Sequence, residues 1–223
     1  MRLTKATKEA IKYACLHFHY AKCVPVNPLG YNIYNDKNEW CGVILYARGA
    51  SKDAGKFLGL GGGEILELVR VALNGKQECT SKAVAESLKL LKKDCPLCQV
   101  VVSYADCDQN HLGTIYQATN WIYIGETTKG EIHSYIVNGV KRHEKALKET
   151  VIRAGYTSTL ENMKKVLKTD DIIPCVTLGK RKYLMPLNKK MRKKILPLSK
   201  PYPKAEDWKR INYKEIYKKE KEK

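Results

Sequence analysis

The most constraining feature of this sequence is the alternation of strand-like and helix-like segments in its middle part. Short branched runs bounded by turn residues predict buried strands, and longer stretches with apolar residues at helical spacing predict helices. The strands are expected at 64–73, 99–106 and 121–127, and the helices at 81–93 and 112–120. This alternation predicts an α/β domain with a mixed, partly parallel central sheet flanked by helices.

The flanking sequence predicts further elements with weaker patterns. They are a helix at 4–16, a strand at 39–47, a glycine-rich loop at 51–63, a hairpin around Asn138-Gly139, a helix at 157–167 and two short strands about Gly179. Thr80 or Ser81 can cap the 81–93 helix, and Thr157 or Ser158 the 157–167 helix. We expect a single catalytic domain over 1–204, followed by a basic tail at 205–223.

Positive charge is concentrated towards the C-terminal end. The chain has 41 Lys and Arg against 23 Asp and Glu, a net charge of +18, and Lys180 to Lys223 holds 17 of the basic and 5 of the acidic residues. Such an excess indicates a polyanionic partner, with a solubilising tail as the alternative. We expect the chain from Lys180 onward to supply much of the affinity for the phosphates of such a partner, and deletion of Ala205–Lys223 to weaken binding.

The eight cysteines do not form a recognisable metal or disulfide pattern. Only Cys95 and Cys98 are closely spaced, and the second Cys or His pair that a zinc site requires is missing. We expect a turn at this pair rather than a redox centre. The sequence shows no membrane-spanning run and no secretory signal, so we expect free thiols and a cytoplasmic protein.

Two positions lie where the ligands of an α/β sheet usually bind. Asp106 ends a strand of almost continuous apolar character, and a loop follows Leu73 at the end of another strand. Ligands of open sheets gather at the carboxyl ends of the strands. Asp106 is therefore a candidate general base or metal ligand, and its alternative role is that of a cap for a helical segment at 110–119.

The order of the elements resembles the GNAT acyltransferase superfamily. In that superfamily the last helix holds a tyrosine close to the acyl donor, and Tyr116 fits this place. Those enzymes carry Arg or Gln followed by spaced glycines after the fourth strand, whereas residues 74–80 read Asn-Gly-Lys-Gln-Glu-Cys-Thr, with one glycine. The usual cradle for the pyrophosphate of coenzyme A is therefore degenerate in this chain.

Eight short motifs, in order and with consistent spacing, resemble one family closely. They are His19-Tyr20 and the runs at 46–51 (YARGAS), 67–73 (ELVRVAL), 102–106 (VSYAD), 113–118 (GTIYQA), 120–123 (NWIY), 182–187 (KYLMPL) and 200–203 (KPYP). Over residues 17–204 the chain is similar to the Mom family of phage DNA-modification proteins.

This resemblance implies an activity as well as a GNAT-related fold. Mom-like proteins attach a carbamoylmethyl (acetamido) group to the exocyclic amine of adenine in double-stranded DNA, which shields phage DNA from host restriction endonucleases. The family is linked to an iron ion and to a donor of the acetyl-CoA type. The expected partners are double-stranded DNA and a small-molecule carbon donor, without a membrane. The expected location is the cytoplasm of a bacterial host if the chain is phage-encoded.

The candidate metal ligands are His19, Tyr20 and Asp106. Imidazole, phenolate and carboxylate are all plausible iron ligands. Adjacent residues of an extended strand point to opposite faces, so His19 and Tyr20 can share a metal only if the backbone bends between them. The alternative is that both side chains pack in the core.

The remaining candidates are catalytic and donor-binding residues. Asp106, Tyr116 and Arg70 are assigned to catalysis, with Tyr116 as an acid, and Arg70, Ser81 and Ser103 to the donor, with Ser81 at a helix start that could bind phosphates. The alternatives are an ion pair between Arg70 and Glu67, a helix cap at Ser81 and core packing of Tyr116.

Two other functions stay open beside DNA modification. One is a GNAT-type N-acetyltransferase of a protein or small molecule, which the degenerate glycine loop and the net charge disfavour. The other is a DNA-binding module without catalysis, which has no need of polar groups such as Arg70, Asp106 and Tyr116 at strand ends.

Overall fold

The computed structural model describes residues 1–48, 55–127, 132–176 and 178–204. They divide into two compact units, which we describe separately. The first contains Met1–Ala105, Gly113–Gly125 and Arg181–Tyr202, and the second is built mainly from Glu126–Lys180, together with Asp106–Leu112. The assignment of 1–204 to one catalytic domain stays a prediction, and the predicted tail, 205–223, lies outside the described residues.

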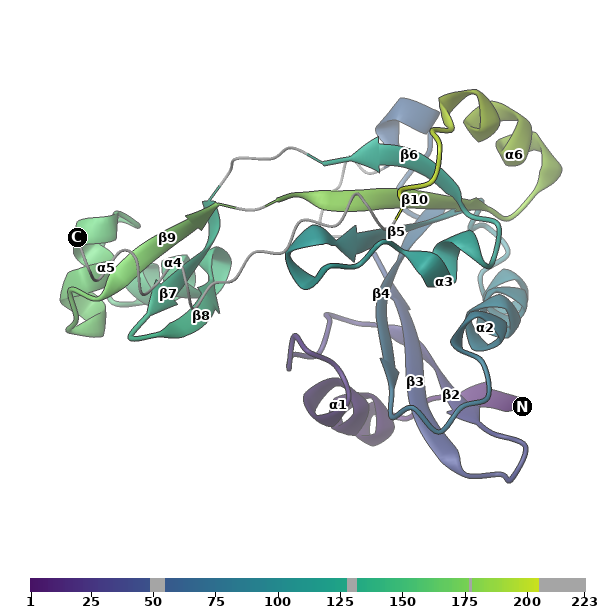
Figure 1. Cartoon of the computed structure of the whole chain (residues 1–223), viewed down its shortest axis with the longest axis horizontal. Helices are drawn as coiled ribbons and strands as arrows, with labels where there is room; N and C mark the ends of the chain where they lie inside the picture. Colours follow the sequence, from purple (N-terminus) through teal and green to yellow (C-terminus); the bar gives the residue numbers. More distant parts are fainter. Residues whose placement is uncertain (49–54, 128–131, 177, 205–223) are drawn as a thin grey trace. The chain divides into compact units, whose positions relative to one another are not determined.

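The first unit is organised by a mixed sheet in the order β1-β2-β3-β4-β5-β10-β6 (Figure 1). The strands β1 to β4 pair antiparallel, and β4 pairs parallel with β5. Their bounds are β1 Arg2–Lys5, β2 Leu29–Tyr34, β3 Trp40–Ala47, β4 Ile65–Leu73, β5 Val100–Asp106, β6 Ile122–Glu126 and β10 Lys180–Pro186. The predicted mixed α/β fold, with helices flanking a central sheet, is thereby confirmed.

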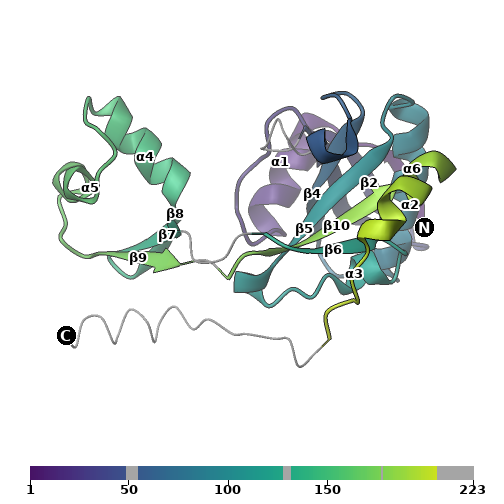
Figure 2. The same cartoon turned by 90° about the horizontal axis from the view of Figure 1, so that it is seen from above.

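Helices cover both faces of this sheet. They are α1 (Lys8–His17), α2 (Thr80–Asp94), α3 (Thr114–Gln117) and α6 (Lys189–Ile195), with the short 3-10 turns η1 (Lys56–Leu58), η2 (Cys107–Gln109) and η3 (Leu196–Leu198). Figure 2 shows α1 and α3 on opposite sides of the sheet. Val101 packs in the α2 and α3 cluster, whereas Val100 and Val102 pack with α6. Burial on both faces explains why β5 is apolar at successive positions.

The second unit is a small antiparallel sheet in the order β8-β7-β9, covered by two helices. Its elements are β7 Ile132–Val137, β8 Val140–His143, α4 Glu144–Arg153, α5 Leu160–Leu167 and β9 Ile172–Val176. Asn138 and Gly139 have φ values of +49° and +76°. Two positive φ values are the signature of the tight hairpin turn that the Asn-Gly pair predicts.

Several boundaries differ from the sequence prediction because tertiary contacts decide them. Residues 4 and 5, expected in a helix, belong to β1 because they pair with β2, and the helix begins only at Lys8, after its cap Thr7. Neither β2 nor α4 was predicted. The two strands about Gly179 exist, but β9 and β10 lie in different sheets.

The predicted helix caps are wrong by one or two residues. Cys79 occupies the cap position of α2, instead of Thr80 or Ser81, and Thr159 caps α5, instead of Thr157 or Ser158. The Cys95–Cys98 pair forms the predicted turn, in which the Cys98 N–H donates to the Cys95 carbonyl at 3.0 Å. None of the helices in the described part of the chain has the length and apolar composition to cross a bilayer.

Candidate functional site

The strands β4 and β5 pair over only a short stretch. Their parallel register covers Ile65 to Glu67 and Val100 to Val102. The next residue of β5 is Ser103, whose buried Oγ lies 2.9 Å from the Leu68 carbonyl oxygen. A side-chain contact thus replaces the backbone ladder where β4 and β5 stop pairing, and Ser103, a predicted donor-binding residue, is held at that point.

Tyr116 reaches the same position from α3. Its hydroxyl lies 2.8 Å from Ser103 Oγ. Because the serine has one hydroxyl proton, Ser103 can donate to Leu68 or to Tyr116, and the phenol can supply the proton of its own contact when the serine bonds to Leu68. Burial raises the pKa of Tyr116. The phenol is therefore protonated at neutral pH, as a proton donor must be.

The core alternative for Tyr116 is also realised, because its ring packs among other aromatic rings. Ring centroids of Trp121 and Tyr183 lie 5.0 Å and 5.1 Å away. Gly113, which precedes α3, has a φ of +80°, and a Cβ there would lie 2.5 Å from the Tyr183 ring. Only glycine meets both conditions, so the GTIY motif is the local requirement for placing Tyr116.

Arg70 points towards the loop that follows α1. Its guanidinium donates to the Val69 carbonyl at 2.7 Å and to Cys23 Sγ at 3.2 Å. These two contacts engage one N–H of each terminal nitrogen, and the alternative pairing with Glu67 stays a prediction. The Nε atom is buried without a hydrogen-bond partner among the described residues.

His19 and Tyr20 lie in this same loop after α1. The backbone bends there, with the Lys22 N–H donating to the His19 carbonyl at 3.2 Å. The two rings stack at 4.4 Å, and His19 Nδ1 accepts the Ala21 N–H at 3.1 Å. The bend that a shared metal requires is therefore present. The core alternative is wrong for Tyr20, which is 52% exposed.

Asp106 acts as a cap at the end of β5. Its carboxylate accepts the Asp108 N–H at 3.0 Å and caps η2. The cap alternative is thus realised, although on a shorter helical turn than the 110–119 segment that was expected. This contact engages Oδ1 of the carboxylate.

The predicted iron requires several donor side chains that lie close together. Within residues 1–48, 55–127, 132–176 and 178–204, no three His, Cys, Asp or Glu side chains gather closely enough to hold a metal ion. His19 Nδ1 is also engaged by the backbone. The described His, Cys, Asp and Glu side chains therefore do not provide a donor set for iron by themselves.

A surface pocket of about 420 Å³ lies beside the start of α2. It is lined by Ser81, Lys82, Ala85 and Leu88 of α2, Ala118, Thr119 and Asn120 after α3, and Met185 of β10. Of these residues, sequence reasoning singled out only Ser81 as a binding candidate. Asn120 has a φ of +59°, and its place between a helical and a strand-like segment was the available signal for a turn.

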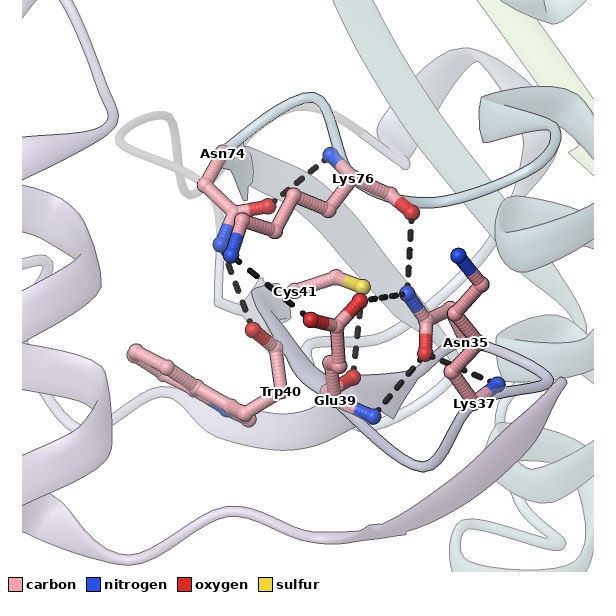
Figure 3. A network of polar contacts seen from close by, with 7 residues as sticks. All are labelled: Asn35, Lys37, Glu39, Trp40, Cys41, Asn74 and Lys76. Carbon is pink, nitrogen blue, oxygen red and sulfur yellow. Dashed lines mark hydrogen bonds and ion pairs between the residues drawn. The ribbon is translucent and has the colours of Figure 1, made fainter.

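The loop between β4 and α2 is tied to the turn between β2 and β3, as Figure 3 shows. Asn74 donates to the Trp40 carbonyl at 3.2 Å, and Asn35 donates to the Lys76 carbonyl at 3.2 Å and to Glu39 at 2.8 Å. The Lys76 N–H donates to Asn74 at 3.0 Å. This N–H is therefore not directed at a phosphate, in agreement with the degenerate glycine pattern.

The start of α2 itself carries an exposed thiol. Cys79 Sγ lies 3.1 Å from Ser81 Oγ, and this hydrogen bond is the main cause of a lowered pKa of the Cys79 thiol. Burial instead raises the pKa of Cys98 to about 11. The two thiols differ because one is hydrogen-bonded at an exposed helix start and the other is removed from water.

A family model covers most of this chain. The model of the Mom protein family matches residues 1–204.

The chain belongs to the Mom protein family.

This membership covers both described units and confirms the resemblance inferred from the eight motifs. No curated protein matches the chain in sequence.

Solved structures provide weaker similarities. An acetyltransferase from Bacillus subtilis in complex with CoA shares 10% identity over 84% of this chain and 99% of its own, with a TM-score of 0.44. A spermidine/spermine N-acetyltransferase from Vibrio cholerae in complex with manganese ions shares 6% identity over 86% and 95%, with a TM-score of 0.45. Scores at this level carry no argument about the activity of this Mom family member.

Proposed function

We propose that this Mom family protein is a DNA-modifying enzyme that attaches a carbamoylmethyl group to the exocyclic amine of adenine in double-stranded DNA. The observation that carries the proposal is the family match over residues 1–204, a range that contains all eight motifs found in the sequence. The modification would protect phage DNA from host restriction endonucleases. The net charge of +18 supports a polyanionic substrate.

The reaction makes definite demands on the protein. The adenine amine is a poor nucleophile, because its lone pair is delocalised into the ring. It must be oriented, lose a proton and meet an activated carbon. The base must also leave the duplex at a cost of a few kcal/mol, since its amine is otherwise enclosed.

The bond changes limit the donor. The amine nitrogen forms a bond to the methylene carbon of the transferred group, the bond from that carbon to a leaving group breaks with its electron pair, and a nitrogen proton passes to a base. An acetyl thioester alone would deliver its carbonyl carbon and yield an acetylamide. A donor of the acetyl-CoA type therefore stays a prediction, and no step is assigned to it.

The hydroxyl pair Ser103 and Tyr116 is the best-defined candidate for proton handling. It lies where β4 and β5 stop pairing, and we assign to Tyr116, which burial keeps protonated, the proton that goes to a leaving group. Asp106 is the proposed base for the amine proton. Arg70, with its buried Nε, is proposed to bind an anionic part of the donor.

The pocket at the start of α2 is the proposed donor subsite. Ser81 and Lys82 line it at the N-terminal end of a helix of 15 residues. Such an end carries partial positive charge and favours a phosphate or carboxylate. The loop between β4 and α2 is held by hydrogen bonds to the turn between β2 and β3 and lacks the glycine-rich cradle. We therefore expect the donor to be recognised by side chains and helix N–H groups.

The experiment is a nucleoside analysis of DNA from cells that express the chain. Under the proposal, mass spectrometry finds a heavier companion of deoxyadenosine, and the DNA resists restriction enzymes with adenine in their sites. If deoxyadenosine has no heavier companion under high expression, the proposal is wrong. Acetylated protein or polyamine in the same cells would favour the N-acetyltransferase, and DNA binding without any modified product would favour the binding module.

A further inference from the structure

The helix α6 carries the densest positive charge in the described part of the chain. Five of its seven residues are Lys189, Lys190, Arg192, Lys193 and Lys194, and all five are exposed. We call these five side chains the α6 cationic face. From Lys180 to Lys204 the sequence has ten basic and no acidic residues, whereas Ala205 to Lys223 has seven basic and five acidic ones. The charge excess of Lys180 to Lys223 therefore lies mainly in the part that the structure describes.

The packing of α6 fixes the direction in which its cationic side chains point. Met191 and Ile195 are buried against Leu58, Leu184 and the strands beneath. At 100° per residue, these two anchors are centred opposite the arc of about 200° that the five cations occupy. Asn188 caps the helix by accepting the Met191 N–H at 2.8 Å. The helix is thus fixed on the first unit with its charges outward.

The cations have no acidic partners within the residues that the structure describes. Lys194 donates to the Leu58 carbonyl at 2.6 Å, which joins α6 to η1, and none of the five forms an ion pair with a described carboxylate. Beside them, Lys182 Nζ lies 4.5 Å above the ring of Phe57.

Part of this arrangement opposes the stability of the helix. Lys189 and Lys193, and Lys190 and Lys194, are like charges at i,i+4 spacing, which repel. Lys189 and Lys190 also lie at the positive end of the helix dipole, where cations are unfavourable, whereas the cations of the last turn lie at its favourable end. An external polyanion would relieve both effects.

We propose that the α6 cationic face binds the phosphate backbone of double-stranded DNA. The inference rests on the proposed function and adds the surface by which the substrate is held. The cations span about 8 Å along the helix at 1.5 Å per residue, and a duplex carries one negative charge per about 1.7 Å of its axis, or about five over that length. A membrane fits less well, because the apolar residues of α6 face the core.

The test compares two variants with the same loss of charge. The first is Lys189→Gln, Lys190→Gln, Arg192→Gln and Lys193→Gln, which leaves Lys194 in its contact with η1. The matched control is Lys8→Gln, Lys12→Gln, Lys92→Gln and Lys93→Gln, at exposed positions of α1 and α2. Binding of each variant to two duplexes of unrelated sequence is measured between about 50 and 200 mM salt, a range over which phosphate contacts make the affinity strongly salt-dependent.

We expect the α6 variant to reduce the slope of log affinity against log salt by about 3 to 4 on both duplexes, at about 0.9 per lost phosphate contact. The control should change it by less than about 1. Reintroducing charge as four arginines should restore the slope, which separates charge from folding, and a thermal melt checks that each variant folds.

The other outcomes overturn the inference in distinguishable ways. Equal slope changes in both variants would show an effect of net charge alone. An unchanged slope in the α6 variant, with wild-type binding intact, would place the DNA surface elsewhere and leave the proposed function standing. Wild-type binding to phosphatidylglycerol vesicles but to neither duplex would make the face a membrane surface. Failure of the wild type to bind any duplex would defeat both proposals.

Discussion

The polar side chains of the first unit lie in two contrasting regions. Around Tyr116 two hydroxyls are hydrogen-bonded inside the protein, that of Tyr116 with Ser103 and that of Tyr183 with Gln117. On the α6 cationic face the polar side chains are exposed, and no described carboxylate pairs with them. The segment from Arg181 to Ile195 contributes to both, with Tyr183 inside and the cations outside.

This contrast teaches how the two regions can contribute to function. A buried hydrogen-bonded hydroxyl has a fixed position and a shifted pKa, so it can orient a proton. An exposed cation has neither, so it acts through its charge on a partner that comes from solution. Substitutions should therefore affect the chemical step in the first region and the salt dependence of binding in the second.

The sharpest test of the interior region is Tyr116→Phe. Loss of the phenolic proton should lower DNA modification by about 100- to 10,000-fold, the usual contribution of a positioned acid. Tyr31→Phe removes a hydroxyl bonded to Asp94 instead of Ser103 and should keep the modification. Nucleoside mass spectrometry with both proteins at equal expression measures the effect, and equal yields would reduce Tyr116 to a packing residue.

Under the α6 cationic face, Ile195→Ala should be the most damaging change to stability. Removing this buried side chain should lower the free energy of unfolding by about 2 to 5 kcal/mol, because a cavity forms between helix and sheet. Its exposed neighbour provides the control, since Lys193→Ala should stay within about 0.5 kcal/mol of wild type. Urea unfolding measures both, and similar midpoints would mean that α6 is not anchored as described.

Substitutions of Asp106 test the role of a carboxylate that accepts a backbone hydrogen bond. Asp106→Asn keeps an oxygen acceptor for the Asp108 N–H, whereas Asp106→Ala removes the cap and should lower stability by about 0.5 to 2 kcal/mol. If the carboxylate is a base, both variants lose modification. If Asn retains full modification, the residue is only a cap.

The thiol at the start of α2 predicts a pH effect. The Ser81 hydrogen bond lowers the pKa of Cys79 by favouring the thiolate, so Ser81→Ala should move the midpoint of Cys79 alkylation to higher pH. Thr80→Ala should leave it in place, because Thr80 Oγ1 bonds to Gln77 instead. Iodoacetamide labelling across a pH series, read by peptide mass spectrometry, gives both midpoints. An unchanged midpoint in Ser81→Ala would contradict the assignment of the lowered Cys79 pKa to the Ser81 hydrogen bond.

Deletion of Ala205–Lys223 should have the smallest effect. The deletion removes a net charge of +2, so the salt slope should flatten by less than in the four-residue α6 variant. A salt titration of the truncated chain measures the change. A larger loss than in the α6 variant would move the main DNA contact to the tail.

The sequence by itself determined the elements with strong local patterns. The α/β class, the strands β3 to β6, the helix α2 and the Asn-Gly hairpin follow from periodicity and turn chemistry, which act within a few residues. The family also followed from eight local motifs in order. The short strands β1 and β2 were missed because their stability comes from pairing with each other and with β3.

Only the tertiary structure decided which side chains meet. Ser103 and Tyr116 are 13 residues apart, and Arg70 and Cys23 are 47 apart, so no local pattern predicts either contact. The pocket beside α2 likewise combines three separate segments. The charge of α6 was visible in the sequence, but its outward direction follows from the burial of Met191 and Ile195, which depends on the sheet beneath them.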